Sequence, residues 1–267
     1  MDLNDEIGFA KKLVVSLVKS PLYSSRSEQS LDQELTLYFQ ETRILKLNDY
    51  FQIKNLFNQS SYFVFKIINV EPSELEVFRV NNVQTCLCQS SSIQDKCIWF
   101  GNNEPECFIL KDYALEIKKV LNFYEYFHSR DKITPLLLIH GPSGSGKLRS
   151  VETACRNLSF HLCKVNCVNL AGESASAVEK RVEIFIQNSI EYGPCIILFK
   201  SFHFLFKLKD INEFNKRVIN SFFNLVNSIK TKTDNRILVV CTTDSKQSIN
   251  AEILAKFNQE IEIKKEI

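Results

Sequence analysis

Residues 141–150 read GPSGSGKLRS, and this stretch decides the fold. It follows the apolar run 135–140 and precedes a segment whose apolar residues recur with helical spacing. A loop of the form G-x-x-x-x-G-K between a strand and a helix is typical of the phosphate-binding P-loop. Three of the chain's seven glycines fall here, which indicates a backbone requirement, because glycine lets a chain wrap closely around an anion.

Leu148 distinguishes this loop from a complete P-loop, which has serine or threonine there to hold magnesium. Leucine offers no oxygen, and Ser150 points elsewhere on the helix. We therefore predict an ATP-binding loop that lacks its usual magnesium ligand; the alternative is a glycine-rich turn without a ligand. The predicted nucleotide-binding residues are Gly141, Pro142, Ser143, Gly144, Ser145, Gly146, Lys147 and Leu148.

Composition narrows the class of protein. The chain has 267 residues, 45% of them hydrophobic, which suits one large or two modest domains. Its formal charge is +2 with no dense basic stripe, which argues against nucleic-acid binding. No apolar run approaches the roughly 18 residues of a membrane span, and the acidic N-terminus has no signal-peptide pattern, so we expect a cytosolic protein.

The nine cysteines are an odd number, and several lie in apolar stretches where a reduced thiol packs as a small hydrophobe. We expect no disulfide scaffold. Cys86, Cys88, Cys97 and Cys107 come closest to a metal pattern, but they lack the paired C-x-x-C spacing of structural zinc sites. Ordinary thiols are favoured over zinc, and we predict no metal site.

The second half of the chain predicts an α/β domain over residues 133–267. Apolar strand-like runs alternate with helical patterns, which is typical of βαβ units and a parallel sheet with helices on both faces. The strand-like runs lie at 135–140, 161–167, 195–199, 236–243 and 260–263.

The first half predicts a small β-rich domain over residues 1–110. The runs 35–40, 62–70 and 75–80 are β-like. An acidic tilt suits a protein-docking surface, although an ordinary solvated face is the simpler interpretation. Residues 111–132 have helical spacing and predict a linking helix between the two domains.

A series of motifs resembles the AAA family of ring ATPases in order and spacing. They are GPSGSGK, ESASAVEKRVEIFIQNS, GPCIILFKSFHFLF, ILVVCTTDS and FNQEIEI. Residues 160–182 look like the first ATPase domain of the peroxisomal branch of that family, and LTLYFQETRILKLNDYFQI and YFVFKIINVEP are similar to the end of its N-terminal domain. The resemblance implies a P-loop AAA-type sheet, and we expect 133–267 to stop before the helical lid.

The resemblance also implies that the hydrolytic residues are replaced. Lys200 and Ser201 stand where an active member has Asp-Glu, Thr243 where it has a polar sensor asparagine, and Lys256 where it has an arginine finger. We therefore predict no catalytic residue and ATP binding without hydrolysis. Lys200 offers a charge that could offset phosphate without magnesium, or it points to solvent. His203 is expected to be a packed or surface side chain rather than a base.

By resemblance, the partners are a sister AAA protein, peroxin-1, in a heterohexamer and a peroxisomal membrane anchor protein, with a ubiquitinated import receptor as substrate. The expected location is the cytosol and the cytosolic face of the peroxisomal membrane. Two alternatives stay open. One is an independent P-loop hydrolase or kinase whose acid is Asp210, Glu213 or Asp244, and the other is a scaffold with a vestigial loop.

Overall fold

The computed structural model describes residues 7–21, 31–54, 62–98, 113, 115–117, 119, 134–171, 173–206, 216–232 and 236–264. The chain divides into two compact units, Met1–Phe100 and Gly101–Ile267. The predicted linking helix at 111–132 lies mostly outside the described residues, and helical backbone is described there only at 113, 115–117 and 119. The domain limits near 110 and 132 therefore stay predictions.

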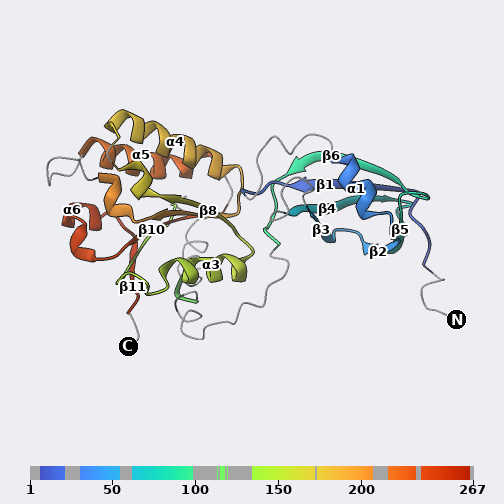
Figure 1. The fold of residues 1–267 in the computed structure, drawn as a ribbon, viewed down its shortest axis with the longest axis horizontal. Coiled ribbons are helices and arrows are strands. Elements are labelled where there is room, and N and C mark those ends of the chain that lie inside the picture. The colour runs from blue at the N-terminus through green and yellow to red at the C-terminus, as the bar shows by residue number, and fades with distance from the viewer. Residues whose placement is uncertain are drawn as a thin grey trace. The chain divides into compact units, whose positions relative to one another are not determined.

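The first unit is built on a four-stranded sheet in the order β3-β4-β1-β6 (Figure 1). Strand β1 is antiparallel to β4 and parallel to β6, and a separate pair joins β2 to β5. The elements are β1 (Lys12–Val18), α1 (Asp32–Tyr38), β2 (Arg43–Lys46), β3 (Tyr50–Lys54), β4 (Tyr62–Glu71), β5 (Val77–Val80) and β6 (Cys86–Ile93). Alternating burial of Phe63, Phe65 and Ile67 along β4 gives this sheet one face in the core.

Helix α1 corrects the sequence interpretation, which read 35–40 as β-like. Leu31, Leu35 and Phe39 recur every four residues and are all buried, so this short segment presents one apolar stripe. Asp32 and Glu34 lie in the first turn, where negative charge suits the helix N-terminus. The aromatic content that suggested a strand instead serves packing against the sheet. The other two β-like runs, 62–70 and 75–80, overlap with strands β4 and β5.

The second unit contains a five-stranded, wholly parallel sheet in the order β11-β7-β10-β9-β8. Its strands are β7 (Leu136–His140), β8 (His161–Asn166), β9 (Cys195–Lys200), β10 (Ile237–Thr243) and β11 (Gln259–Glu262). Its helices are α3 (Lys147–Leu158), α4 (Ala175–Ile190), α5 (Lys216–Lys232) and α6 (Ala251–Leu254), with the 3-10 turns η2 (Cys167–Leu170), η3 (Phe202–Phe206) and η4 (Lys246–Ser248). The predicted α/β fold class is confirmed.

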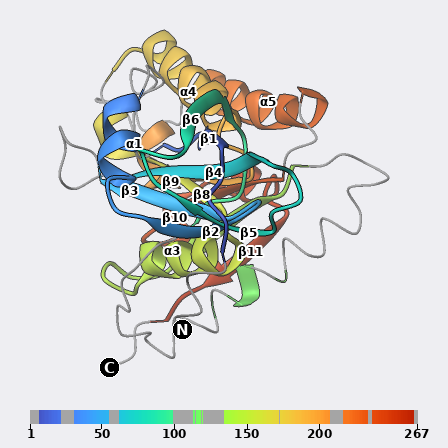
Figure 2. The same ribbon diagram turned by 90° about the vertical axis from the view of Figure 1, so that its right-hand side faces the viewer.

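Helices cover both faces of this sheet. Helix α3 lies on one face, and α4 and α5 lie on the other (Figures 1 and 2). Along β7 the buried side chains alternate, so Leu137 and Ile139 pack with Val151 of α3, whereas Leu136 and Leu138 belong to the cluster under α4 and α5. Burial on both faces explains the continuous apolar runs that the sequence shows for these strands.

Cysteines help to fill this core. The eight described cysteines are free thiols, and most are buried. Burial raises the pKa of the Cys167 thiol to about 12 and raises that of Cys241 well above its ordinary value. Both therefore stay protonated at neutral pH and pack as small apolar groups. Within the described ranges, no helix combines the length and apolar character needed to cross a membrane.

Phe222 is a direct test of the packing between α5 and the sheet. Its ring is 1% exposed and lies 5.0 Å from the rings of Phe199 and Phe202. Phe222→Ala should lower the free energy of unfolding by about 3–5 kcal/mol in urea denaturation followed by circular dichroism. The control Ile184→Ala, at a side chain 50% exposed on α4, should change it by less than about 1 kcal/mol. Equal effects of the two variants would contradict this packing.

Candidate nucleotide site

The glycine-rich loop lies where β7 ends and α3 begins. Gly141 adopts φ 156° and Gly146 adopts φ 88°, the latter a left-handed conformation at the N-cap of α3. A Cβ atom on Gly141 would lie 2.1 Å from the carbonyl oxygen of Ile263, just after β11. In the same place the N–H of Ile263 donates to the carbonyl of His140 at 2.8 Å. Close approach of two backbones therefore requires glycine at the start of the loop.

The N-terminus of α3 is open to an anion. Gly146 provides no side-chain cap, and the first turn holds no acidic residue. The first N–H groups of a helix have no partner within it, and the helix dipole favours negative charge there. Ser145 Oγ is buried, and no hydrogen-bond partner is found for it among the described residues. These donors fit a phosphate.

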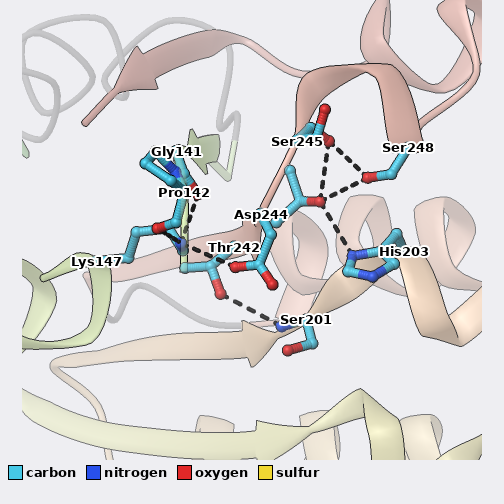
Figure 3. Close-up of polar contacts among 10 residues, drawn as sticks. Gly141, Pro142, Lys147, Ser201, His203, Thr242, Asp244, Ser245 and Ser248 are labelled. Atoms are coloured by element: carbon cyan, nitrogen blue, oxygen red, sulfur yellow. Dashed lines mark hydrogen bonds and ion pairs between the residues drawn. The ribbon is translucent and has the colours of Figure 1, made fainter. Parts of the chain in front are cut away.

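Lys147 is the cation of the loop, and it is held by three oxygens (Figure 3). Its Nζ donates to the carbonyls of Gly141 at 2.6 Å and Pro142 at 2.9 Å, and it lies 2.9 Å from Asp244 Oδ1. The lysine side chain is 12% exposed and that of Asp244 is 56% exposed. A largely buried ammonium needs such partners, because burial without them would disfavour its charge.

Leu148 and Ser150 leave the loop without a side-chain oxygen at the usual magnesium position. Leu148 is partly buried and packs against the core on the α3 face. Ser150 is fully buried, and its Oγ donates to the carbonyl of Gly146 at 3.2 Å. Its hydroxyl is therefore engaged with the helix backbone, in line with the expectation that Ser150 does not replace the missing ligand.

The end of β9 carries the two residues expected to replace Asp-Glu. Lys200 is exposed at the last position of the strand. Ser201 follows in a left-handed conformation with φ 56°, and its N–H donates to Thr242 Oγ1 at 3.3 Å on the adjacent β10 (Figure 3). Neither residue presents a carboxylate to the loop.

Thr243 and His203 form a buried polar cluster rather than part of the loop. Thr243 Oγ1 lies 3.0 Å from His203 Nδ1 and 2.8 Å from Ser248 Oγ, and it donates to the carbonyl of Ser245 at 3.1 Å. The His203 ring is 7% exposed and lies 4.3 Å from the Phe204 ring. His203 therefore packs in the interior, in line with the expectation that it does not act as a base.

Lys256, matched from sequence to an arginine finger, turns back onto its own unit. Its Nζ donates to Asn220 Oδ1 at 3.4 Å and lies 4.7 Å from the centre of the Phe223 ring, both on α5. Of the three acids considered for an independent hydrolase, Asp210 and Glu213 lie outside the described residues, and Asp244 contacts Lys147.

The contact between Asp244 and Lys147 is the feature that sequence reasoning missed. Asp244 was named only as a possible acid after a strand end. The pairing of β7 with β10 places His140 opposite Thr243, so the loop after one strand meets the residue after the other. Because the sequence does not give strand order, only this adjacency identifies Lys147 and Asp244 as partners.

Comparisons with known proteins match the same part of the chain. The sequence model of the ATPase family associated with various cellular activities (AAA) matches residues 137–265. Residues 137–265 form an AAA domain.

Similar proteins extend the match beyond the AAA domain. The chain is 28% identical over 131 residues to the peroxisomal ATPase PEX6 of Cricetulus griseus, covering 49% of this chain and 13% of the relative. It is 23% identical over 287 aligned positions to PEX6 of Homo sapiens, covering 96% of this chain and 28% of the relative. For PEX6 of Arabidopsis thaliana the identity is 26% over 230 positions, covering 73% and 24%. The predicted resemblance of this chain to the peroxisomal AAA ATPases is confirmed. The chain spans only 13–28% of the length of these relatives.

Three of the four cysteines that were weighed as a metal pattern lie among the described residues. Cys86 Sγ and Cys88 Sγ lie 3.9 Å apart on β6, Cys97 is buried, and Cys107 lies outside the described residues. Where the structure is described, no group of three or more histidine, cysteine, aspartate or glutamate side chains is placed to hold a metal ion.

Alanine substitutions at Gly141 and Gly144 distinguish the cost of a steric clash from the cost of backbone strain in the glycine loop. Gly141→Ala forces a backbone shift against Ile263 and should cost about 2–4 kcal/mol of unfolding free energy. Gly144 has φ 79° but no neighbouring atom within 4 Å, so Gly144→Ala should cost only about 1–2 kcal/mol. Urea denaturation of both variants measures the difference, and a Gly144 variant as unstable as the Gly141 variant would contradict the close approach of β11.

Proposed function

We propose that residues 133–267 bind ATP through the loop 141–148 and do not hydrolyse it. The observation that carries the proposal is the uncapped N-terminus of α3 behind a glycine loop whose carbonyls hold the Lys147 ammonium. Backbone N–H groups of the loop would hold the phosphates, Ser145 Oγ would find a partner there, and Lys147 would reach the β and γ phosphates.

The lack of hydrolysis follows from what surrounds the loop. Leu148 offers no magnesium ligand. Strand β9 ends at Lys200 and is followed by Ser201, and neither residue carries a carboxylate to hold metal or polarise water. Lys256 lies against α5, and a lysine cannot provide the bidentate pair of N–H donors that an arginine guanidinium offers. Lys200, exposed at the strand end, would offset phosphate charge directly. The nucleotide then acts as a structural ligand that stabilises the folded domain.

The names of the relatives suggest the biological setting. We propose a part of a peroxisomal AAA ATPase that assembles with peroxin-1 in a heterohexamer, docked by an anchor protein at the cytosolic face of the peroxisomal membrane. The whole assembly would extract the ubiquitinated import receptor and recycle it for matrix protein import. Residues 133–267 would supply scaffold and contacts with neighbours, and residues 1–110 would supply protein docking.

An ATP-hydrolysing domain is the second candidate, and Asp244 is the observation that favours it. Its carboxylate lies 2.9 Å from Lys147 Nζ, next to the space assigned to phosphate. As a magnesium ligand or base, Asp244 would restore part of the missing chemistry. This candidate predicts binding that depends on magnesium, with release of phosphate.

Calorimetric titration of ATP into the full chain, with magnesium and again with EDTA, tests the proposal together with a phosphate-release assay. We expect similar affinity in both buffers and no release of phosphate. Lys147→Ala should weaken binding at least about tenfold, because it removes the charged donor to the phosphates. The matched control Lys180→Ala, which removes an exposed charge from α4 on the opposite face of the sheet, should bind as the wild type does.

The outcomes separate the candidates. Binding lost on chelation, together with phosphate release, would favour the hydrolase. Absence of binding in both buffers, or equal binding by the Lys147 variant, would favour a scaffold with a vestigial loop.

A further inference from the structure

Lys147 already has an anionic partner within the protein. Asp244 Oδ1 lies 2.9 Å from its Nζ, so the ammonium that should meet a phosphate is paired with a carboxylate (Figure 3). The two other contacts of Nζ are neutral carbonyls of the loop itself. Asp244 therefore supplies the negative charge in the contacts that the structure gives for this ammonium.

The backbone on either side of Asp244 is anchored. On one side, Thr243 is 1% exposed and its hydroxyl contacts Ser248 Oγ at 2.8 Å and His203 Nδ1 at 3.0 Å. On the other side, Ser245 Oγ accepts a hydrogen bond from the N–H of Gln247 and caps η4. The Asp244 side chain is largely exposed, so it can turn away from Lys147 without unfolding its surroundings.

We propose that Asp244 competes with the terminal phosphate of a nucleotide for Lys147, and so makes the loop favour ADP over ATP. The inference rests on the proposed function, because it concerns the same loop, and it names the nucleotide that this loop prefers. Phosphate can take the ammonium only when the ion pair with Asp244 is broken, and the freed carboxylate then stays close to the phosphates.

The preference for ADP follows from charge. ATP carries an additional negative charge compared with ADP, and like charges at short range repel. In a complete P-loop, magnesium would neutralise part of this charge, but here Leu148 offers no side-chain oxygen and neither Lys200 nor Ser201 offers a carboxylate. Repulsion by Asp244 therefore penalises ATP more than ADP. If Asp244 held magnesium instead, removing its carboxylate would weaken ATP binding rather than strengthen it.

The test is calorimetric titration of ATP and of ADP, in EDTA and in magnesium, into the full chain and its Asp244→Asn variant. Asparagine keeps the size of the side chain and an oxygen that can accept from Lys147, but it removes the charge. The matched control is Glu183→Gln on α4, which removes the same charge from an exposed position on the opposite face of the sheet.

In EDTA, the wild type should bind ADP more tightly than ATP. Asp244→Asn should tighten ATP binding roughly two- to tenfold and ADP binding less, while Glu183→Gln should change neither. Weaker or unchanged ATP binding by Asp244→Asn would overturn the inference, as would an equal gain for both nucleotides. A loss of ATP affinity confined to the magnesium buffer would also overturn it and assign Asp244 to the metal.

The failure of this inference is distinct from the failure of the proposed function. If the wild type binds ATP through Lys147 and the Asp244 variant binds it no more tightly, only the competition is wrong. If neither the wild type nor the Asp244 variant binds either nucleotide, both proposals are wrong.

Discussion

The second unit depends on burying both faces of a parallel sheet. Strand β7 lies between β11 and β10, and the side chains of its residues 136–139 are all at most 4% exposed. A parallel strand in this position needs helices on both sides, and every connection must return over a face of the sheet. The loops that follow the parallel strands therefore gather at one edge, and that edge is where the glycine loop lies.

Two consequences of this arrangement shape the candidate site. The backbone at Ile263, just after β11, passes so close to Gly141 that only glycine fits, which fixes the start of the loop. The end of β10 lies beside the end of β7, which brings Asp244 to Lys147. The glycine loop and the anion that would compete with phosphate thus both follow from the same strand order.

The sequence predicted the parts of the fold that depend on local pattern. Continuous apolar runs predicted the strands of the parallel sheet, and the glycines with Lys147 predicted the loop at the start of α3. Residues 35–40 were assigned wrongly, because Thr36, Tyr38 and Phe39 suit a strand by residue type, whereas the packing of Leu35 and Phe39 against the first sheet decides for a helix. The pairing of Lys147 with Asp244 could not be predicted, since it depends on which strands are neighbours. Thr243 was matched to the sensor position, yet its side chain is turned into the buried cluster with His203 and Ser248.

The most direct test of the central claim is a crystal structure of the chain grown with saturating ATP in EDTA. The account predicts phosphates bound by the N–H groups of residues 143–148, Lys147 within hydrogen-bond distance of a phosphate oxygen, and Asp244 separated from Lys147. A loop that keeps the Lys147–Asp244 pair with the nucleotide absent or bound elsewhere would contradict it.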